Sequence, residues 1–303
     1  MANEKQNNKQ MKKLLFFLLI FIAGNSVCNS LMGQGIEDLV KNRNIGGYEK
    51  VMTFERKPAV LPGVREADVT WSKIVWRLID LREKANQHFY FPKTEVQGRT
   101  NLINLLLKGI KANSVLAFEA PILDNNEFAT PISYDQVKAQ FGAGTKTVMR
   151  RNFENGQMEP VVIQQEIPTE EVKQLILKEV WYFDKQRSSL QVRILAICPI
   201  RVYFRDEDTN QEIPLRKKLF WVYYPEIRTL LAKNESLNAR NGARNYSFDD
   251  LFLLRNFDGY IIKEENVYDN RDILSYASGD YASQEAERIK TAIFNYEQDL
   301  WEY

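Results

Sequence analysis

The chain has a single histidine with which to do acid, base or metal chemistry. His88 is the only one among 303 residues, which excludes zinc sites built from several histidines and any catalytic triad that needs two imidazoles. Its neighbours Phe89 and Tyr90 are aromatic. We expect His88 to be a half-buried polar tip with a structural role, since histidine is intermediate between core and surface residues.

Two short runs resemble ligand-binding loops in part. In the run GAGTKT, residues 142–147, Thr145 separates the glycine from the lysine, and the earlier glycine of a phosphate-binding loop is absent. The run DEDTN, residues 206–210, matches the first ligands of a calcium loop, but Gln211 replaces the glycine and Lys217 stands where the bidentate glutamate belongs. We therefore expect two turns, and no metal or cofactor.

Adjacent carboxylates could serve as a general acid and a general base. Glu170 with Glu171, and Asp249 with Asp250, form such pairs, but each lies in the predicted first turn of a helix, where the helix dipole favours acidic residues. The aromatic run over residues 220–224 could stack on a sugar ring, or divide between core and surface along a strand. An exported enzyme acting on envelope polysaccharide, or a ligand-binding module, is therefore the alternative function.

The stretch DVTWSKIVWRLIDLREKANQHFYFP, residues 68–92, must position the most distinctive side chains. Apolar residues at positions 71, 74, 75, 78 and 79 predict an amphipathic helix over residues 69–86, with Asp68 as its N-cap. Aromatic and arginine side chains are enriched in interface hot spots, although the same stripe could close the core of a domain. The candidate partner interface consists of Trp71, Trp76, Arg77, Asp80, Arg82 and Glu83.

The rest of the chain alternates between helical and extended patterns. Helices are predicted at about residues 101–111, 131–141, 169–177, 225–233, 248–256 and 283–301. Strands are predicted at about residues 88–91, 115–118, 180–183, 190–204, 219–224 and 260–263, and Asn155 with Gly156 predicts a hairpin between residues 147–153 and 161–165. We expect an α+β fold with mixed helices and an antiparallel sheet, with two subdomains as an alternative.

The N-terminus has the pattern of a secretory signal. Lys12 and Lys13 precede an unbroken apolar run over residues 14–23, which is too short to span a bilayer. We expect a signal peptide over residues 1–33, with cleavage after Ser26 or Gly33, and a lipoprotein anchored at Cys28 as an alternative.

Downstream of the signal we expect three regions. They are an extended arm over residues 34–62, an α+β domain over residues 63–275 and a C-terminal helix over residues 276–303.

The charge of the chain excludes a nucleic-acid footprint. Lys and Arg number 41 and Asp and Glu number 40, a net charge of +1. Removal of residues 1–33 takes away four lysines and one glutamate, so 37 minus 39 leaves the mature chain at −2. Nearly balanced charge gives little repulsion between copies and is compatible with self-assembly.

The block WSKIVWRLIDLREKAN, residues 71–86, followed by Tyr90, Phe91 and Pro92, resembles the opening signature of the gliding motility protein GldN, called PorN in non-gliding relatives. The later run KKLFWVYYPEIR, residues 217–228, and the helix after Ser247 extend the resemblance. The likeness runs from about residue 55 to about residue 268.

The resemblance implies a periplasmic, non-enzymatic structural subunit of the type IX secretion system. Such a subunit would associate with copies of itself, and with a GldK/PorK-like outer-membrane lipoprotein, in a ring beneath the outer membrane. The periplasmic part of a GldM/PorM-like protein is a further candidate partner. The resemblance transfers no catalytic residue to this chain.

Overall fold

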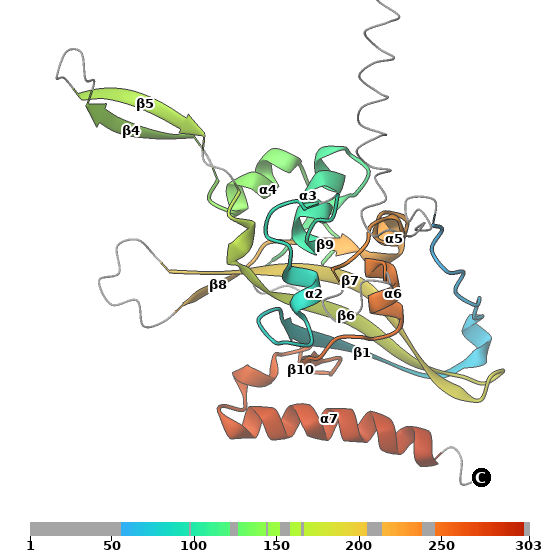
Figure 1. Cartoon of the computed structure of the whole chain (residues 1–303). Helices are drawn as coiled ribbons and strands as arrows, with labels where there is room; N and C mark the ends of the chain where they lie inside the picture. The colour runs from blue at the N-terminus through green and yellow to red at the C-terminus, as the bar shows by residue number, and fades with distance from the viewer. Residues whose placement is uncertain are drawn as a thin grey trace, which may run out of the picture. The chain divides into compact units, whose positions relative to one another are not determined.

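The computed structural model describes residues 56–96, 98–121, 127–143, 145–151, 158–164, 167–204, 214–237 and 246–299. These residues form an α+β fold, as the sequence predicts (Figure 1). The expected signal peptide and residues 34–55 of the expected arm lie outside the described residues. The alternative of two subdomains is not confirmed.

The main sheet contains eight strands, and all its pairings are antiparallel. Its order is β10-β1-β6-β7-β9-β2-β3, with β8 also paired to β7. The strands are β1 (Val69–Asp80), β2 (Ala117–Glu119), β3 (Pro131–Ile132), β6 (Val172–Asp184), β7 (Ser189–Tyr203), β8 (Leu215–Lys218), β9 (Phe220–Tyr223) and β10 (Tyr260–Glu264). Strand β7 pairs with β9 before Pro199 and with β8 after it. The proline lies at this change of partner, which explains how it is tolerated in a long central strand.

A separate sheet of two strands forms the predicted hairpin. Strand β4 (Thr145–Arg151) pairs in antiparallel register with β5 (Met158–Gln164), and Val148 lies opposite Val161. The predicted turn at Asn155 and Gly156 lies outside the described residues.

Three of the helices begin at a residue whose side chain caps the first turn. The helices are α2 (Gln87–Tyr90), α3 (Leu102–Lys111), α4 (Tyr134–Gln140), α5 (Tyr224–Lys233), α6 (Phe248–Leu253) and α7 (Asp280–Asp299). The amide of Asn104 donates to the side chain of Asn101 over 2.7 Å, and both Ser133 and Ser247 form capping boxes. These caps satisfy backbone amides that the first turn leaves without partners.

The predicted helix over residues 69–86 is wrong, because residues 69–80 form strand β1. This strand pairs with β6 and β10, and over residues 75–79 side chains pack on both of its faces. Trp76 and Leu78 pack on one face, and Val75 and Ile79 on the other. A strand buried on both faces loses polar alternation, and its apolar residues then match the helical spacing by chance.

Two shorter predictions are also wrong. The expected strand over residues 88–91 is the short helix α2, and the expected helix over residues 169–177 is a single 3-10 turn followed by β6. Gln174 and Lys178 pair with β1 and β7 in this strand. Tertiary pairing therefore overrides the acidic start, at Glu170 and Glu171, that favoured a helix.

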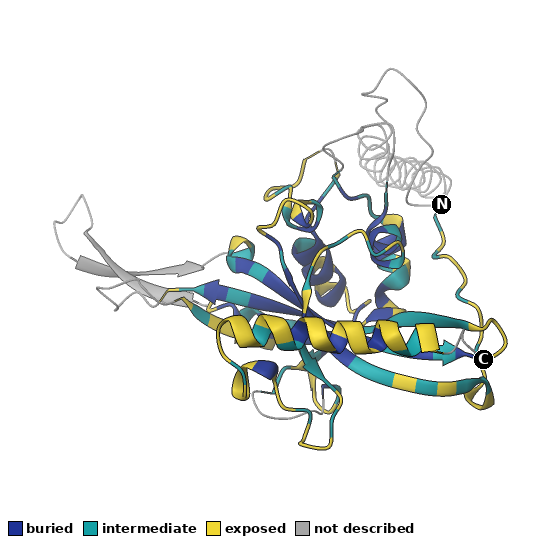
Figure 2. Cartoon of the chain, turned by 90° about the horizontal axis from the view of Figure 1, so that it is seen from below, coloured by how far each residue is buried: buried dark blue, intermediate teal, exposed yellow. Residues whose placement is uncertain are grey.

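Helices cover the sheet in two places. Helices α3, α5 and α6 enclose the largest core, which includes Ile79, Leu177 and Val222 from the strands. Helix α7 packs on β1 and β10 through Ala286, Ile289 and Ile293, and its opposite side is exposed (Figure 2). The C-terminal helix that the sequence predicts is thus part of the packed structure.

The described end of the expected arm lies against the same chain. Arg56 pairs with Asp250 at 3.2 Å, and Arg228 donates to the carbonyl oxygen of Ala59 over 2.7 Å. Residues 56–62 are therefore fastened mainly by polar contacts, since Val60 is almost fully exposed.

His88 predicts a pH dependence of stability. Burial lowers the pKa of His88 from 6.5 to about 4. The unfolded chain binds this proton more readily, so stability from His88 is complete above about pH 6.5 and is lost as the pH falls towards 4. The urea midpoint should fall between pH 7 and pH 5, and His88→Gln should reduce this fall. An equal fall in both proteins would contradict the assignment.

Candidate protein interface

Three of the six predicted interface residues have their contacts inside the chain. The ring of Trp71 stacks on Tyr296 of α7 with centroids 4.7 Å apart. Trp76 and Arg77 are buried in the sheet, with 4% and 9% exposure. The strand geometry places these two side chains on opposite faces, so the structure does not gather the six residues on one surface.

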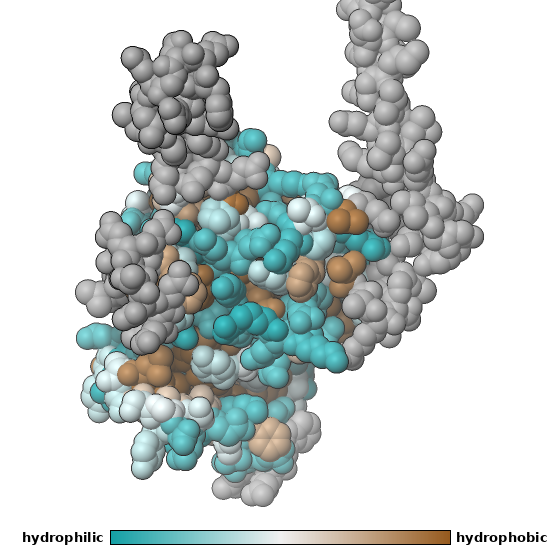
Figure 3. All heavy atoms as spheres, turned by 60° about the vertical axis from the view of Figure 1, so that its left-hand side comes forward, coloured by the Kyte–Doolittle hydropathy of each residue, from teal (hydrophilic) through white to brown (hydrophobic). Residues whose placement is uncertain are grey.

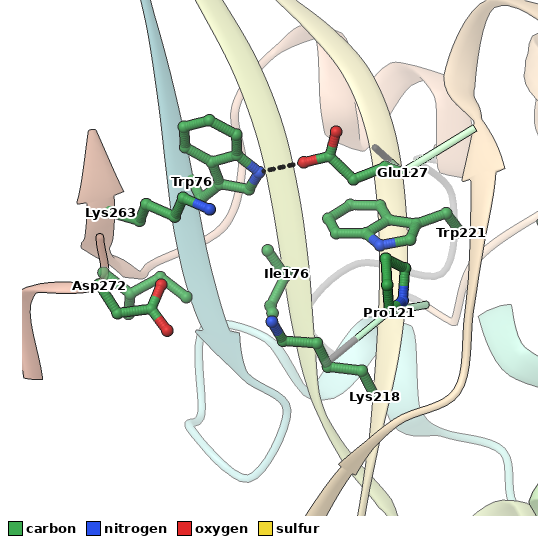
Figure 4. Close-up of a pocket in the computed structure, with 9 residues that line it drawn as sticks. Trp76, Pro121, Glu127, Ile176, Lys218, Trp221, Lys263 and Asp272 are labelled. Atoms are coloured by element: carbon green, nitrogen blue, oxygen red, sulfur yellow. Dashed lines mark hydrogen bonds between the residues drawn. The ribbon is translucent and has the colours of Figure 1, made fainter. Parts of the chain in front are cut away.

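Trp76 belongs to a charged network that lines a small pocket (Figure 4). Its indole N–H donates to Oε1 of Glu127 over 2.9 Å, and Lys178 donates to Oε2 over 2.6 Å. The ammonium of Lys263 lies 4.5 Å from the Trp76 ring, and burial lowers its pKa. Both oxygens of Glu127 are used within the fold, so this carboxylate fastens its loop to the sheet.

Arg77 belongs to a second network, centred on Glu179. The carboxylate of Glu179 has 0% exposure and accepts from Arg255 at 2.9 Å, Trp181 at 3.2 Å and Arg77 at 3.4 Å. Arg77 also donates to the carbonyl oxygen of Gly259 over 2.8 Å. Two guanidinium groups thus share one buried carboxylate, and together they join β1, β6 and the segment after α6.

The other three members of the predicted interface lie at the end of β1: Asp80 is its last residue and is largely buried, whereas Arg82 and Glu83 follow it and are exposed. Arg82 donates from Nε to Asp80 over 2.9 Å, and this hydrogen bond holds the pKa of Asp80 below its usual range. Glu83 is exposed. Partial burial of the Glu83 carboxyl, and then the charges of Asp258 and Asp80, raise its pKa. This end of the set is an acidic corner of the surface, which we define as Asp80, Arg82, Glu83 and Asp258.

A second surface was missed by sequence reasoning. Between β10 and α7, the side chains of Val267, Tyr268, Leu274 and Tyr276 are exposed. On the face shown in Figure 3, hydrophobic side chains gather in a patch low in the view and in smaller groups above it, among hydrophilic side chains. Repeated tyrosines near Arg271 are the sequence signal that could have indicated this surface.

The described residues contain no group of three His, Cys, Asp or Glu side chains that could hold a metal ion. Cys198 is buried, and burial raises its pKa to about 12, so the thiol packs as a small hydrophobic group. None of the helices in the described ranges is long and apolar enough to cross a membrane.

The Glu179 network predicts a large loss of stability on substitution. Glu179→Gln should lower the free energy of unfolding by about 3–5 kcal/mol, because Arg77 and Arg255 lose their shared counter-charge in a buried site. Arg82→Ala, which removes a surface pair, should cost less than about 1 kcal/mol. Urea unfolding of both variants checks this difference, and equal losses would argue against a structural role for the network.

Comparison with known proteins identifies the family. A search of curated proteins found no match. The family model described as "Gliding motility associated protein GldN" matches residues 64–302, which is most of the chain and includes every described strand and helix. The match confirms the resemblance in the block at residues 71–86 and extends it through the C-terminal helix. The chain therefore belongs to the GldN family of gliding motility associated proteins.

Proposed function

We propose that the chain is a non-enzymatic structural subunit of the gliding and type IX secretion machinery, to which its family belongs. In this proposal it is exported through the signal at residues 1–33 and works in the periplasm. Copies assemble in a ring with a GldK/PorK-like lipoprotein, which holds them at the outer membrane. The periplasmic part of a GldM/PorM-like protein is the further partner.

The exposed segment between β10 and α7 is the observation that best supports assembly. Val267 and Tyr268 are large hydrophobic side chains exposed to solvent, with 91% and 64% exposure. Tyrosine and arginine are enriched at the centres of protein interfaces, where water is excluded around them. A surface of this composition favours binding to another protein.

A ring requires two different surfaces on each copy, because head-to-tail contacts are heterologous. Among the six residues predicted from sequence, Asp80, Arg82 and Glu83 remain candidates for such a surface. Trp71, Trp76 and Arg77 would support an interface only indirectly, through the strand that positions the acidic corner.

Purification from the native envelope in mild detergent tests the proposed function. We expect the chain to leave the column as an assembly whose mass is many times that of one subunit, accompanied by the lipoprotein. Native mass spectrometry gives the mass, and peptide sequencing identifies the companion. A solitary monomer that hydrolyses a glycan or a peptide would contradict the proposal.

A further inference from the structure

Arg271 lies between two tyrosine rings. Its guanidinium carbon is 4.9 Å from the ring centroid of Tyr268 and 4.3 Å from that of Tyr276. Cation–π contacts of this kind hold the planar group in place. Within the described residues Arg271 forms no ion pair, whereas Arg82, Arg99 and most other arginines are paired with carboxylates. The N–H groups of Arg271 are therefore oriented, and no carboxylate of the described ranges pairs with them.

The turn that carries Tyr268 is fixed by its own hydrogen bonds. Asp269 and Asn270 have φ of 55° and 51°, and the amide of Arg271 donates to the carbonyl oxygen of Tyr268 over 3.2 Å. These features are typical of a type I′ turn, in which Asp and Asn tolerate positive φ. The side chain of Asn266 accepts from the Tyr268 amide over 3.0 Å. The turn therefore needs little ordering when it binds a partner.

The acidic corner offers the complementary chemistry. Arg82 is engaged by Asp80, and Glu83 and Asp258 have no ion-pair partner in the described part of the chain. Both side chains are exposed, and each adds to the negative potential at the other. An incoming guanidinium would relieve this repulsion and form charge-assisted hydrogen bonds. Tyr260 is half exposed and lies near Asp80 and Glu83, and near the guanidinium of Arg216.

The two surfaces are at opposite ends of the edge strand β10. Tyr260 pairs with Leu78 near the acidic corner, and Glu264 pairs with Val75 near the turn at residues 266–271. Strand geometry separates the ends of β10 by about 13 Å. Arg271 and Glu83 are thus placed for contact between two copies rather than within one.

We infer that Arg271 of one copy binds Glu83 and Asp258 of the next copy. Val267 and Tyr268 then pack beside Tyr260 at the same junction. The contact is head-to-tail: one copy uses its Arg271 surface and the next copy uses its acidic corner, so each copy keeps its other surface for a further neighbour. This inference rests on the proposed function, since it names the surfaces through which copies assemble.

Charge reversal tests the pairing. Arg271→Glu and Glu83→Lys should each weaken self-association by about 30-fold, the size of a hot-spot loss, because each places like charges at the junction. The double variant Arg271→Glu with Glu83→Lys should restore assembly to within about threefold, because opposite charges face each other again. Sedimentation velocity on full-length chains purified in mild detergent measures the association.

Lys111→Glu is the matched control, because this exposed lysine lies at the end of α3, which Figure 1 shows on the other side of the sheet from β10. It should assemble as the unaltered chain does, and circular dichroism should show all variants folded. Full assembly of both single variants, or a double variant as weak as they are, would overturn the inference while leaving the proposed function intact. An unaltered chain that stays monomeric would overturn both.

Discussion

The buried carboxylate of Glu179 is the interaction on which the rest of the structure depends. It lies in the middle of β6 and accepts hydrogen bonds from Arg77 of β1 and from Arg255, which follows α6. Removing the carboxylate would leave both guanidinium groups without their shared counter-charge in a buried site. This one carboxylate therefore links β1, β6 and the segment that leads into β10.

This constraint extends to the surface. Arg77 binds the carbonyl oxygen of Gly259, and Asn86 accepts from the amide of Asp258 over 2.9 Å. A Cβ on Gly259 would lie 2.5 Å from the carbonyl oxygen of Leu78, so glycine is required for this close approach. The segment that presents Asp258 and begins β10 is thus held from both sides. A buried network sets the geometry of the acidic corner that we assign to assembly.

The sequence predicts the local features that depend on few residues. Four predicted helices, at about residues 101–111, 131–141, 225–233 and 248–256, and the antiparallel sheet are confirmed. The helix predicted over residues 69–86 is wrong because burial on both faces removes the polar alternation of a strand. Periodicity alone cannot distinguish such a strand from a helix.

The candidate interface shows the same limit. Trp76 and Arg77, which the sequence predicts at a partner interface, are buried, and their burial depends on pairing with β6, which is about 100 residues away in the chain. The stacking of Arg271 on Tyr268 and Tyr276 depends on a local turn. The sequence does not show which arginines form ion pairs, so it could not indicate that Arg271 forms none within the described residues. The surfaces that we assign to assembly are defined by charged side chains that form no ion pair within the described residues.

Assembly through these surfaces can be tested at the contact itself. A photoreactive aromatic residue in place of Tyr268, activated in the assembled native envelope, should cross-link to a second copy. Mass spectrometry should place the bond within residues 82–86 or 256–263 of that copy. Cross-links confined to the same chain, or to another region of the neighbour, would contradict head-to-tail assembly through Arg271 and the acidic corner.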